Sequence, residues 1–387
     1  MRTASADIVI VGGGIIGVSI AYHLARRGAT RVVILERESE LGTGATSKAT
    51  GGIRHQFSTP VNIRLSQMSS PHFVRFAEET GVDVGWRQHG YLFLARPGDA
   101  WEALKKSAEL QVKLGVPTRV LSPQDAAALV PQLRVDDLAG GTFCAIDGSA
   151  NPTAALNGYL KVARELGVEV VRDAAVTAID RQGGRVAGVR TANGARYAAD
   201  VVIDAAGPRA AEVAEFVGSR IPARPFRRQV FVMSRDPELA AGIPFTVDLE
   251  TGWYVHQEAN GKLIFGGTDR DNRPGLEPVV DWDGFDLVAR AALHRLPSVA
   301  ERVRRETAYA GVRTLTPDFH AIIGSVPPLE GFVVASACNG HGFMHAPAIG
   351  QLVAELVLDG AATSLDLTPL SPERFAKRAD SGEAVMF

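Results

Sequence analysis

Asp7-Ile-Val-Ile-Val-Gly12-Gly-Gly14-Ile-Ile-Gly17 is an apolar run that ends in spaced glycines. In a strand–turn–helix unit the glycine at 12 permits a tight turn, and the one at 14 lets backbone approach a pyrophosphate. The glycine at 17 lets the helix pack closely on the strand. The helix that follows would present free N–H groups and the positive end of its dipole to a phosphate. This spacing predicts a dinucleotide-binding unit.

A second apolar strand pattern, Arg31–Leu35, ends at Glu36, 19 residues after Gly17. A carboxylate at the tip of this strand can accept hydrogen bonds from both ribose hydroxyls of an adenosine. A glycine-rich turn in some other α/β protein is the alternative, but two strands, a helix and a terminal acid together favour nucleotide binding.

We find one such fingerprint in the 387 residues. Flavoenzymes that are reduced by NAD(P)H usually carry a second nucleotide fold. A single copy therefore favours a flavin that receives electrons directly from an organic substrate, although the fingerprint alone also allows an NAD-dependent dehydrogenase.

Composition is that of an ordinary globular protein long enough for two domains. The formal net charge of −2 gives no reason to expect nucleic acid or an anionic membrane as a partner. Cys144 and Cys338 form no CxxC pair, which excludes a disulfide framework or a cysteine zinc site and favours a cytoplasmic location. The uncharged run 8–25 is explained by the nucleotide fold, so no transmembrane segment is expected.

Strand and helix patterns of the nucleotide-binding type recur at the start, middle and end of the chain, with proline-punctuated strands between them. We therefore expect an α/β (α+β) fold with a discontinuous nucleotide-binding domain and an antiparallel-sheet substrate domain. The expected ranges are 1–85, 145–221 and 310–387 for the first domain, and 86–144 and 222–309 for the second.

Further segments occur in a characteristic order: Gly90-Tyr-Leu-Phe-Leu94, Asp204-Ala-Ala-Gly207, Ala310-Gly-Val-Arg-Thr-Leu-Thr-Pro-Asp318, Ile323-Gly324 and Gly340-His-Gly-Phe-Met-His-Ala-Pro347. With the fingerprint and Glu36, they resemble the FAD-dependent D-amino acid oxidase superfamily over almost the whole chain. Within it, the chain resembles sarcosine oxidase, glycine oxidase and the β subunits of the heteromeric proline and sarcosine dehydrogenases/oxidases. The resemblance implies a Rossmann-like FAD-binding domain of the glutathione-reductase type.

The resemblance also implies where FAD binds. Its AMP half would lie on the fingerprint, Glu36 and Arg37, and the loop 43–53 would run past the pyrophosphate and the isoalloxazine. The residues expected to contact FAD are Gly12, Gly14, Ile15, Ile16, Gly17, Glu36, Arg37, Thr43, Gly44, Ser47, Lys48, Gly51, Gly52, Ile53, Val176, Ala206, Gly207, Gly311, Asn339, Gly340, His341, Gly342, Phe343 and Met344.

The glycines in Gly340–Met344 support this assignment on physical grounds. They leave bare N–H groups ahead of a helix, where negative charge on a reduced flavin would be stabilised. His341 and His345 also have the i,i+4 spacing of a metal pair, but no third ligand is evident nearby, so we expect an active-site helix start and no metal.

Three departures from the relatives matter. Sarcosine oxidase attaches its flavin to a Cys where this chain has Gly311, and dimethylglycine dehydrogenase-like relatives use a His where this chain has Ser47-Lys48-Ala49. We therefore expect non-covalent FAD. Sarcosine oxidase also has an oxygen-activating Lys at the position of Ile264. Lys262 is two residues away and could share its strand face, but the change favours a dehydrogenase.

A planar, always-charged Arg suits a carboxylate because it donates two parallel hydrogen bonds. By resemblance, Arg313 and Arg54 are the candidate substrate carboxylate ligands, while the second cation of sarcosine oxidase is replaced by Met344. Either Arg could instead make a structural ion pair. The candidate catalytic set is Arg313, Arg54, Tyr254, His341 and Met344, with His55 and His256 as weaker candidates.

These features predict an enzyme that oxidises the C–N bond of a small amino acid or secondary amine such as an N-methylglycine, proline or a D-amino acid. Hydride transfer from the α-carbon to flavin N5 would give an imine. The alternatives are a non-catalytic assembly flavoprotein and a subunit that is active only with partners. An electron acceptor or partner subunit is possible in either case.

Overall fold

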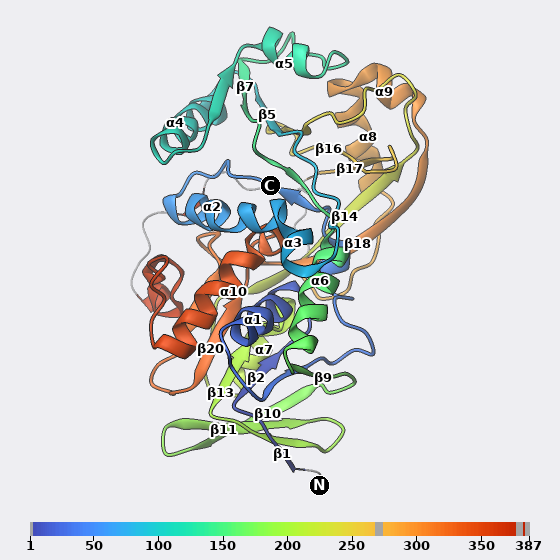
Figure 1. Cartoon of the computed structure of the whole chain (residues 1–387). Helices are drawn as coiled ribbons and strands as arrows, with labels where there is room; N and C mark the ends of the chain where they lie inside the picture. The colour runs from blue at the N-terminus through green and yellow to red at the C-terminus, as the bar shows by residue number, and fades with distance from the viewer. Residues whose placement is uncertain (1–2, 268–273, 377–381, 384–387) are drawn as a thin grey trace.

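The computed structural model describes residues 3–267, 274–376 and 382–383. The predicted domain ranges 1–85, 222–309 and 310–387 each include some residues outside this description. Thr268, shortly after Ile264, also lies outside it. Three large sheets build the chain, and Figure 1 shows the eight-stranded sheet above a helix-covered six-stranded sheet, with the four-stranded sheet at the bottom.

The six-stranded sheet carries the nucleotide-binding pattern. Its order is β19-β20-β13-β2-β3-β9, and its strands are parallel except for β19. The strands are β2 (Ile8–Val11), β3 (Val32–Leu35), β9 (Glu169–Val171), β13 (Val201–Asp204), β19 (Ile322–Ser325) and β20 (Phe332–Ser336). Because both faces are covered, β2 and β3 are wholly buried and read as continuous apolar runs.

Helices cover one face of this sheet and a second sheet lies on the other. The buried residues of α1 (Ile15–Arg26), α6 (Pro152–Glu165) and α10 (Gly342–Asp359) form one core with the first face. The second face packs on α7 (Ala210–Glu215) and on the four-stranded sheet β1-β12-β11-β10. That sheet contains β1 (Thr3–Ser5), β10 (Val176–Gln182), β11 (Arg185–Thr191) and β12 (Arg196–Ala198).

The eight-stranded sheet has the order β18-β14-β17-β16-β15-β5-β7-β6 and is antiparallel except between β15 and β5. Its strands are β5 (Tyr91–Ala95), β6 (Thr118–Leu121), β7 (Gly140–Cys144), β14 (Arg224–Met233), β15 (Phe245–Asp248), β16 (Tyr254–Gln257), β17 (Leu263–Gly266) and β18 (Arg305–Leu315). A separate two-stranded antiparallel sheet is formed by β4 (Gly52–Ile53) and β8 (Gly148–Ser149).

The other helices connect or cover these sheets. They are α2 (Pro60–Val74), α3 (Phe76–Thr80), α4 (Asp99–Lys113), α5 (Pro123–Leu129), α8 (Gly284–Arg295) and α9 (Pro297–Arg302), with 3₁₀ turns η1 (Thr46–Lys48), η2 (Gly207–Arg209), η3 (Thr368–Leu370) and η4 (Pro372–Ala376). No helix among the described residues is long and apolar enough to cross a membrane.

The predicted fold class is confirmed, with differences of detail. The expected boundary at residue 310 falls inside β18, because β14 and β18 pair along almost their whole length, from Arg224 opposite Leu315 to Met233 opposite Arg305. Arg313 therefore projects from a strand of the eight-stranded sheet. Apart from this position, the division into two domains stays a prediction.

Candidate active site

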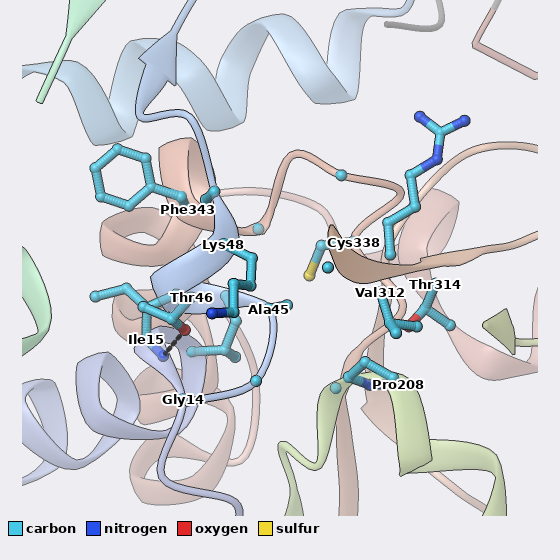
Figure 2. Close-up of a pocket in the computed structure, with 18 of the residues that line it drawn as sticks. Gly14, Ile15, Ala45, Thr46, Lys48, Pro208, Val312, Thr314, Cys338 and Phe343 are labelled. Atoms are coloured by element: carbon cyan, nitrogen blue, oxygen red, sulfur yellow. Dashed lines mark hydrogen bonds between the residues drawn. The ribbon is translucent and has the colours of Figure 1, made fainter. Parts of the chain in front are cut away.

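A cavity of about 750 Å³ lies at the carboxyl ends of the parallel strands β2, β3, β13 and β20, and it extends to the eight-stranded sheet. Ligands of open α/β sheets bind at this edge. Figure 2 shows two opposed walls: one carries Gly14, Ile15, Ala45, Thr46 and Lys48, and the other carries Pro208, Val312 and Thr314. Segments that are distant in the sequence therefore build one site.

Two glycines of the fingerprint have the predicted roles: Gly12 in the tight turn and Gly17 in close helix–strand packing. Gly12 has a positive φ of 111°, and a Cβ there would lie 2.5 Å from the Ala205 carbonyl oxygen. A Cβ on Gly17 would lie 2.1 Å from the Gly12 oxygen, so this glycine permits close helix–strand packing and does not line the cavity. Gly14 lines the cavity at the start of α1.

Glu36 fixes the loop that follows β2. Its Oε2 accepts from the Gly13 N–H at 2.8 Å and its Oε1 accepts from the Glu38 N–H at 2.9 Å. A carboxylate has about four acceptor positions, so Glu36 retains the capacity to accept from ribose hydroxyls. Arg37 and Val176 line the same end of the cavity.

Thr46 lines the cavity and lies in the loop 43–53 that is expected at the cofactor, but it is not among the residues expected to contact FAD. Its Oγ1 accepts from the Ile15 N–H at 3.0 Å, across 31 residues, and so caps the start of α1 (Figure 2). The loop 43–48 is thereby attached to the helix N-terminus where a pyrophosphate would bind. Only the fold brings a threonine to this position.

At the other end of the cavity, α10 begins at Gly342, as predicted for a helix start. Asn339 and Gly340 both have positive φ, and the Asn339 Oδ1 accepts from the Thr316 N–H at 2.8 Å. These contacts hold the turn that aims the first N–H groups of α10 at the cavity, which Phe343 and Met344 also line.

Gly311 and Lys48 both line the cavity and lie against one another. A Cβ added to Gly311 would be 2.6 Å from the Lys48 Cβ. The two positions that the resemblance implies for covalent flavin attachment are therefore neighbours in this chain. Neither position carries a thiol or an imidazole.

Arg54 and Arg313 both line the cavity but have different surroundings. Arg54 is buried, with its guanidinium 4.3 Å from the Phe57 ring centre and 5.2 Å from that of Phe93. Its Nη1 donates to the Gln56 carbonyl at 2.8 Å. Burial lowers the pKa of Arg54, and the nearby Tyr91, Glu383 and Asp147 act in the opposite direction. Arg313 is half-buried on β18, beside Gly340.

An aromatic wall faces these cations. Tyr91 and Phe245 stack with ring centres 4.3 Å apart, and Tyr254 lies 5.3 Å from Phe245. All three line the cavity, as does Tyr309. Burial raises the pKa of the Tyr91 hydroxyl far above its usual range. Of these four residues, only Tyr254 was predicted from the sequence. An aromatic residue in a strand is usually part of the core, and only the fold shows which face of the sheet it occupies.

Most of the predicted residues come together at the cavity, but some do not. Those outside its lining are Gly17, Ser47, Ile53 and His341. Ser47 lies on the exposed side of η1, where its Oγ donates to the Thr43 carbonyl, and Ile53 is a core residue of β4. His341 lies behind the cavity, with its Nε2 at 3.3 Å from Arg54 Nη2. The remaining cofactor candidates all line the cavity.

His256, a weaker catalytic candidate, and the residues of the lysine question, Lys262 and Ile264, lie outside the cavity lining. Burial lowers the pKa of His256 to about 3, and its ring stacks on Phe245 in the core. Lys262 pairs with Glu306, and Ile264 is buried in β17. Neither residue lines the cavity.

Among the described residues, His341 and His345 belong to no cluster of three metal-binding side chains. The His341 and His345 ring centres are 6.0 Å apart, and His345 Nε2 lies 3.0 Å from Ser66 Oγ. In the described part of the chain, the residues whose metal-binding atoms do cluster are His55, Cys144 and Asp147. The Asp147 oxygens there already accept three N–H groups.

Residues 7–356 match the profile of the family described as FAD dependent oxidoreductase (DAO). FAD-dependent oxidoreductase domain-containing protein 1 of Xenopus laevis is 28% identical, over 96% of this chain and 82% of that protein. Mitochondrial sarcosine dehydrogenase of Homo sapiens is also 28% identical, over 92% of this chain but 40% of its own length. The chain thus spans less than half of that relative. The crystal structure of L-proline dehydrogenase from P. horikoshii matches with a TM-score of 0.90 at 28% identity, over 97% of this chain and 99% of that one.

Proposed function

Because the chain belongs to the FAD-dependent oxidoreductase (DAO) family and is therefore a flavoenzyme, we propose that it oxidises the C–N bond of a small amino acid or secondary amine. The observation that carries this proposal is the pair of arginines, Arg54 and Arg313, that lines the same cavity as the nucleotide fingerprint. A carboxylate-binding site beside the flavin favours amino acids over other reductants.

The cavity fits FAD. Gly12 and Gly14 expose backbone without side chains to the cavity, and Glu36, which also lines it, can accept hydrogen bonds from a ribose. The N-termini of α1 and α10 face the cavity from opposite ends and would stabilise a pyrophosphate and a negatively charged ring, respectively. Gly311 lets the β18 backbone lie directly against the stem of Lys48, where a Cβ would collide.

When bound, FAD supplies a two-electron acceptor for hydride. The protein's part is to hold the substrate with its α-carbon facing that acceptor and to exclude water. We assign the carboxylate to Arg54 and Arg313, and the apolar part of the substrate to the wall of Tyr91, Phe245 and Tyr254. The substrate loses a hydride from its α-carbon and a proton from its nitrogen, which gives an imine.

The direct test is anaerobic mixing of the purified yellow protein with a panel of amino acids and N-methyl amino acids. Bleaching of the flavin absorbance identifies substrates, and each positive compound should be repeated as its carboxamide. If no amine bleaches a protein that dithionite does reduce, the proposal is wrong for the isolated chain. The partner-dependent or assembly role would then be favoured.

Two further parts of this proposal concern the setting of the reaction. The absence of a lysine from the β17 side of the cavity favours an electron acceptor other than oxygen, such as a quinone or a partner protein. Cytoplasmic location, expected from the two separate cysteines, also stays a prediction.

A further inference from the structure

The segment that carries Arg54 is buried although it has no regular structure. Residues 54–57 follow β4, lie outside any strand, and are all buried. Backbone N–H groups in such a segment need acceptors, because an unpaired buried donor is costly. The acceptors therefore determine the path of the chain that holds the guanidinium.

Asp147 supplies the acceptor for the His55 N–H, while the Phe57 N–H donates to the His55 carbonyl. Asp147 lies in the turn between β7 and β8 and its side chain is 0% exposed. Its Oδ1 accepts from the His55 N–H at 2.8 Å and lies 2.7 Å from His55 Nδ1, and its Oδ2 accepts from the Gln56 amide at 3.2 Å. Since a carboxylate only accepts, the His55 Nδ1 donates. One buried carboxylate thus contacts both residues that follow Arg54, and it shares the Gln56 amide with the Tyr91 carbonyl, which accepts at 2.9 Å.

Asp147 is itself firmly placed. Its carbonyl accepts from the Gly90 N–H at 2.8 Å, and the next two residues pair with β4 as Gly148 opposite Ile53 and Ser149 opposite Gly52. Gln56 is held from the far side by Thr142, whose hydroxyl donates to its Oε1 at 2.8 Å. The turn after β7 is therefore tied to the strand that leads into Arg54.

The connection from Asp147 to the guanidinium runs through Gln56. Arg54 Nη1 donates to the carbonyl of Gln56, the residue whose amide Asp147 holds. The negative charge of Asp147 also favours the charged form of Arg54 in a buried setting that otherwise lowers its pKa. A change at Asp147 alters both the place and the electrostatic balance of the guanidinium.

We propose that Asp147 is a positioning residue, which acts through Gln56 to hold Arg54 in the orientation that binds the substrate carboxylate. This inference rests on the proposed function insofar as Arg54 binds a carboxylate. The remaining ring nitrogen of His55 lies 3.0 Å from Ser70 Oγ, so the network is closed on its other side.

The test uses acetate and its neutral isostere acetamide as probes of the resting holoenzyme, followed by perturbation of the flavin absorption spectrum. Asp147→Asn keeps the shape and one acceptor but removes the charge and one hydrogen bond. We expect it to weaken acetate binding roughly ten- to a hundred-fold, since small misplacements of a binding group have effects of this size. Acetamide binding should not change. Thr142→Val should weaken acetate binding less, in the same direction.

The matched control is Asp236→Asn. The Asp236 side chain is equally buried, pairs with Arg302 and does not line the cavity, so acetate binding should stay at the wild-type value. A double-mutant cycle separates positioning from general damage: in an Arg54→Gln background, Asp147→Asn should cause no further loss.

Several results would overturn the inference. They are additive effects in the cycle, equal effects of Asp147→Asn and Asp236→Asn, an equal loss for acetate and acetamide, or no acetate-dependent spectral change in the wild type. If Asp147→Asn does not fold, unchanged acetate binding in Thr142→Val would overturn it as well. The amine panel tests the proposed function separately, because the acetate titration needs no turnover.

Discussion

The resemblance places Gly311 and Lys48 where some relatives attach their flavin covalently, and neither residue offers a thiol or an imidazole for attachment. A side chain at 311 would also collide with the stem of Lys48. We expect FAD to be fully non-covalent. Acid precipitation should release all yellow colour into the supernatant, whereas flavin that remains with the pellet would contradict this.

Arg313 is expected to bind the substrate carboxylate from the β18 wall. Truncation of one partner in a desolvated charge pair costs on the order of 2–5 kcal/mol. Arg313→Ala should therefore lower kcat/KM by roughly 30- to several-thousand-fold, while FAD content stays near wild type. Arg313→Lys should recover only part of the loss, because a point charge does not reproduce the planar fork.

An amidated substrate provides the control for Arg313. The wild type should lose activity on it, and Arg313→Ala should barely distinguish the amide from the acid. If the variant still prefers the free acid as strongly as the wild type does, Arg313 does not bind the carboxylate and Arg54 alone becomes the candidate.

Asp204 is a buried carboxyl at the end of β13 whose Oδ2 has no hydrogen-bond partner in the described part of the chain. Burial raises its pKa to about 8. A raised folded-state pKa means that the stability contribution is complete below the unfolded pKa and is lost as pH rises to about 8, by at most about 1.4 kcal/mol per pH unit. Asp204→Asn should therefore gain stability relative to wild type between pH 5 and 8 and level off above.

Thermal unfolding of the two proteins across pH 5 to 9 measures this difference. An asparagine amide also lacks a partner at that site, but this cost does not depend on pH. A constant difference across the range would show that Asp204 is ionised throughout.

At the scale of elements, β17 lies in the eight-stranded sheet but contributes none of its residues to the lining of the cavity. Ile264 is buried with Val230 and Tyr254, and Lys262 is paired with Glu306. No lysine of this strand lines the cavity, so reoxidation by air should be slow beside reoxidation by a quinone dye. Rapid stoichiometric peroxide release would contradict the prediction. If Lys48→Met then abolished the release, Lys48 would be the oxygen-activating group.

The elements themselves were largely predictable. Strong local signals mark them: Ser122 forms the capping box that starts α5, and Gly194 has the positive φ that its hairpin requires. Extents were less predictable. The apolar pattern of the sequence predicts strands over 228–233 and 252–256. The first begins earlier, at Arg224, because β18 supplies backbone partners that far. The second begins later, at Tyr254, and Gly252 before it has a positive φ.

The site was predictable where chemistry is local in the sequence. Glu36 and the glycines follow from spacing within one unit, whereas Thr46, Tyr91 and Phe245 needed the fold. Asp147 illustrates the reason: it acts on a segment 92 residues away. Its neighbours in the sequence mark only a turn. The face of a strand aromatic and the partner of a buried carboxylate are properties of tertiary packing.

At the scale of the whole molecule, the cavity is where the discontinuous segments meet. Its lining runs from Val11 to Met344 and includes the fingerprint, the loop after β3, the end of β13, β18 and the start of α10. A ligand that fills it contacts elements from every part of the chain. Binding to the folded state alone raises stability by RT ln(1 + [L]/Kd), about 2.7 kcal/mol at a hundredfold excess over Kd.

We therefore expect removal of FAD to lower Tm, and titration of the apoprotein with FAD to raise it with the logarithm of the free concentration. FMN provides the control because it lacks the AMP half that Glu36 and the fingerprint would hold. If both halves of the cavity are used, FMN should give a clearly smaller shift at equal concentration, and Glu36→Gln should reduce the advantage of FAD over FMN. Equal shifts from FAD and FMN would show that the fingerprint end contributes nothing to binding, and the assignment of Glu36 to the ribose would be wrong.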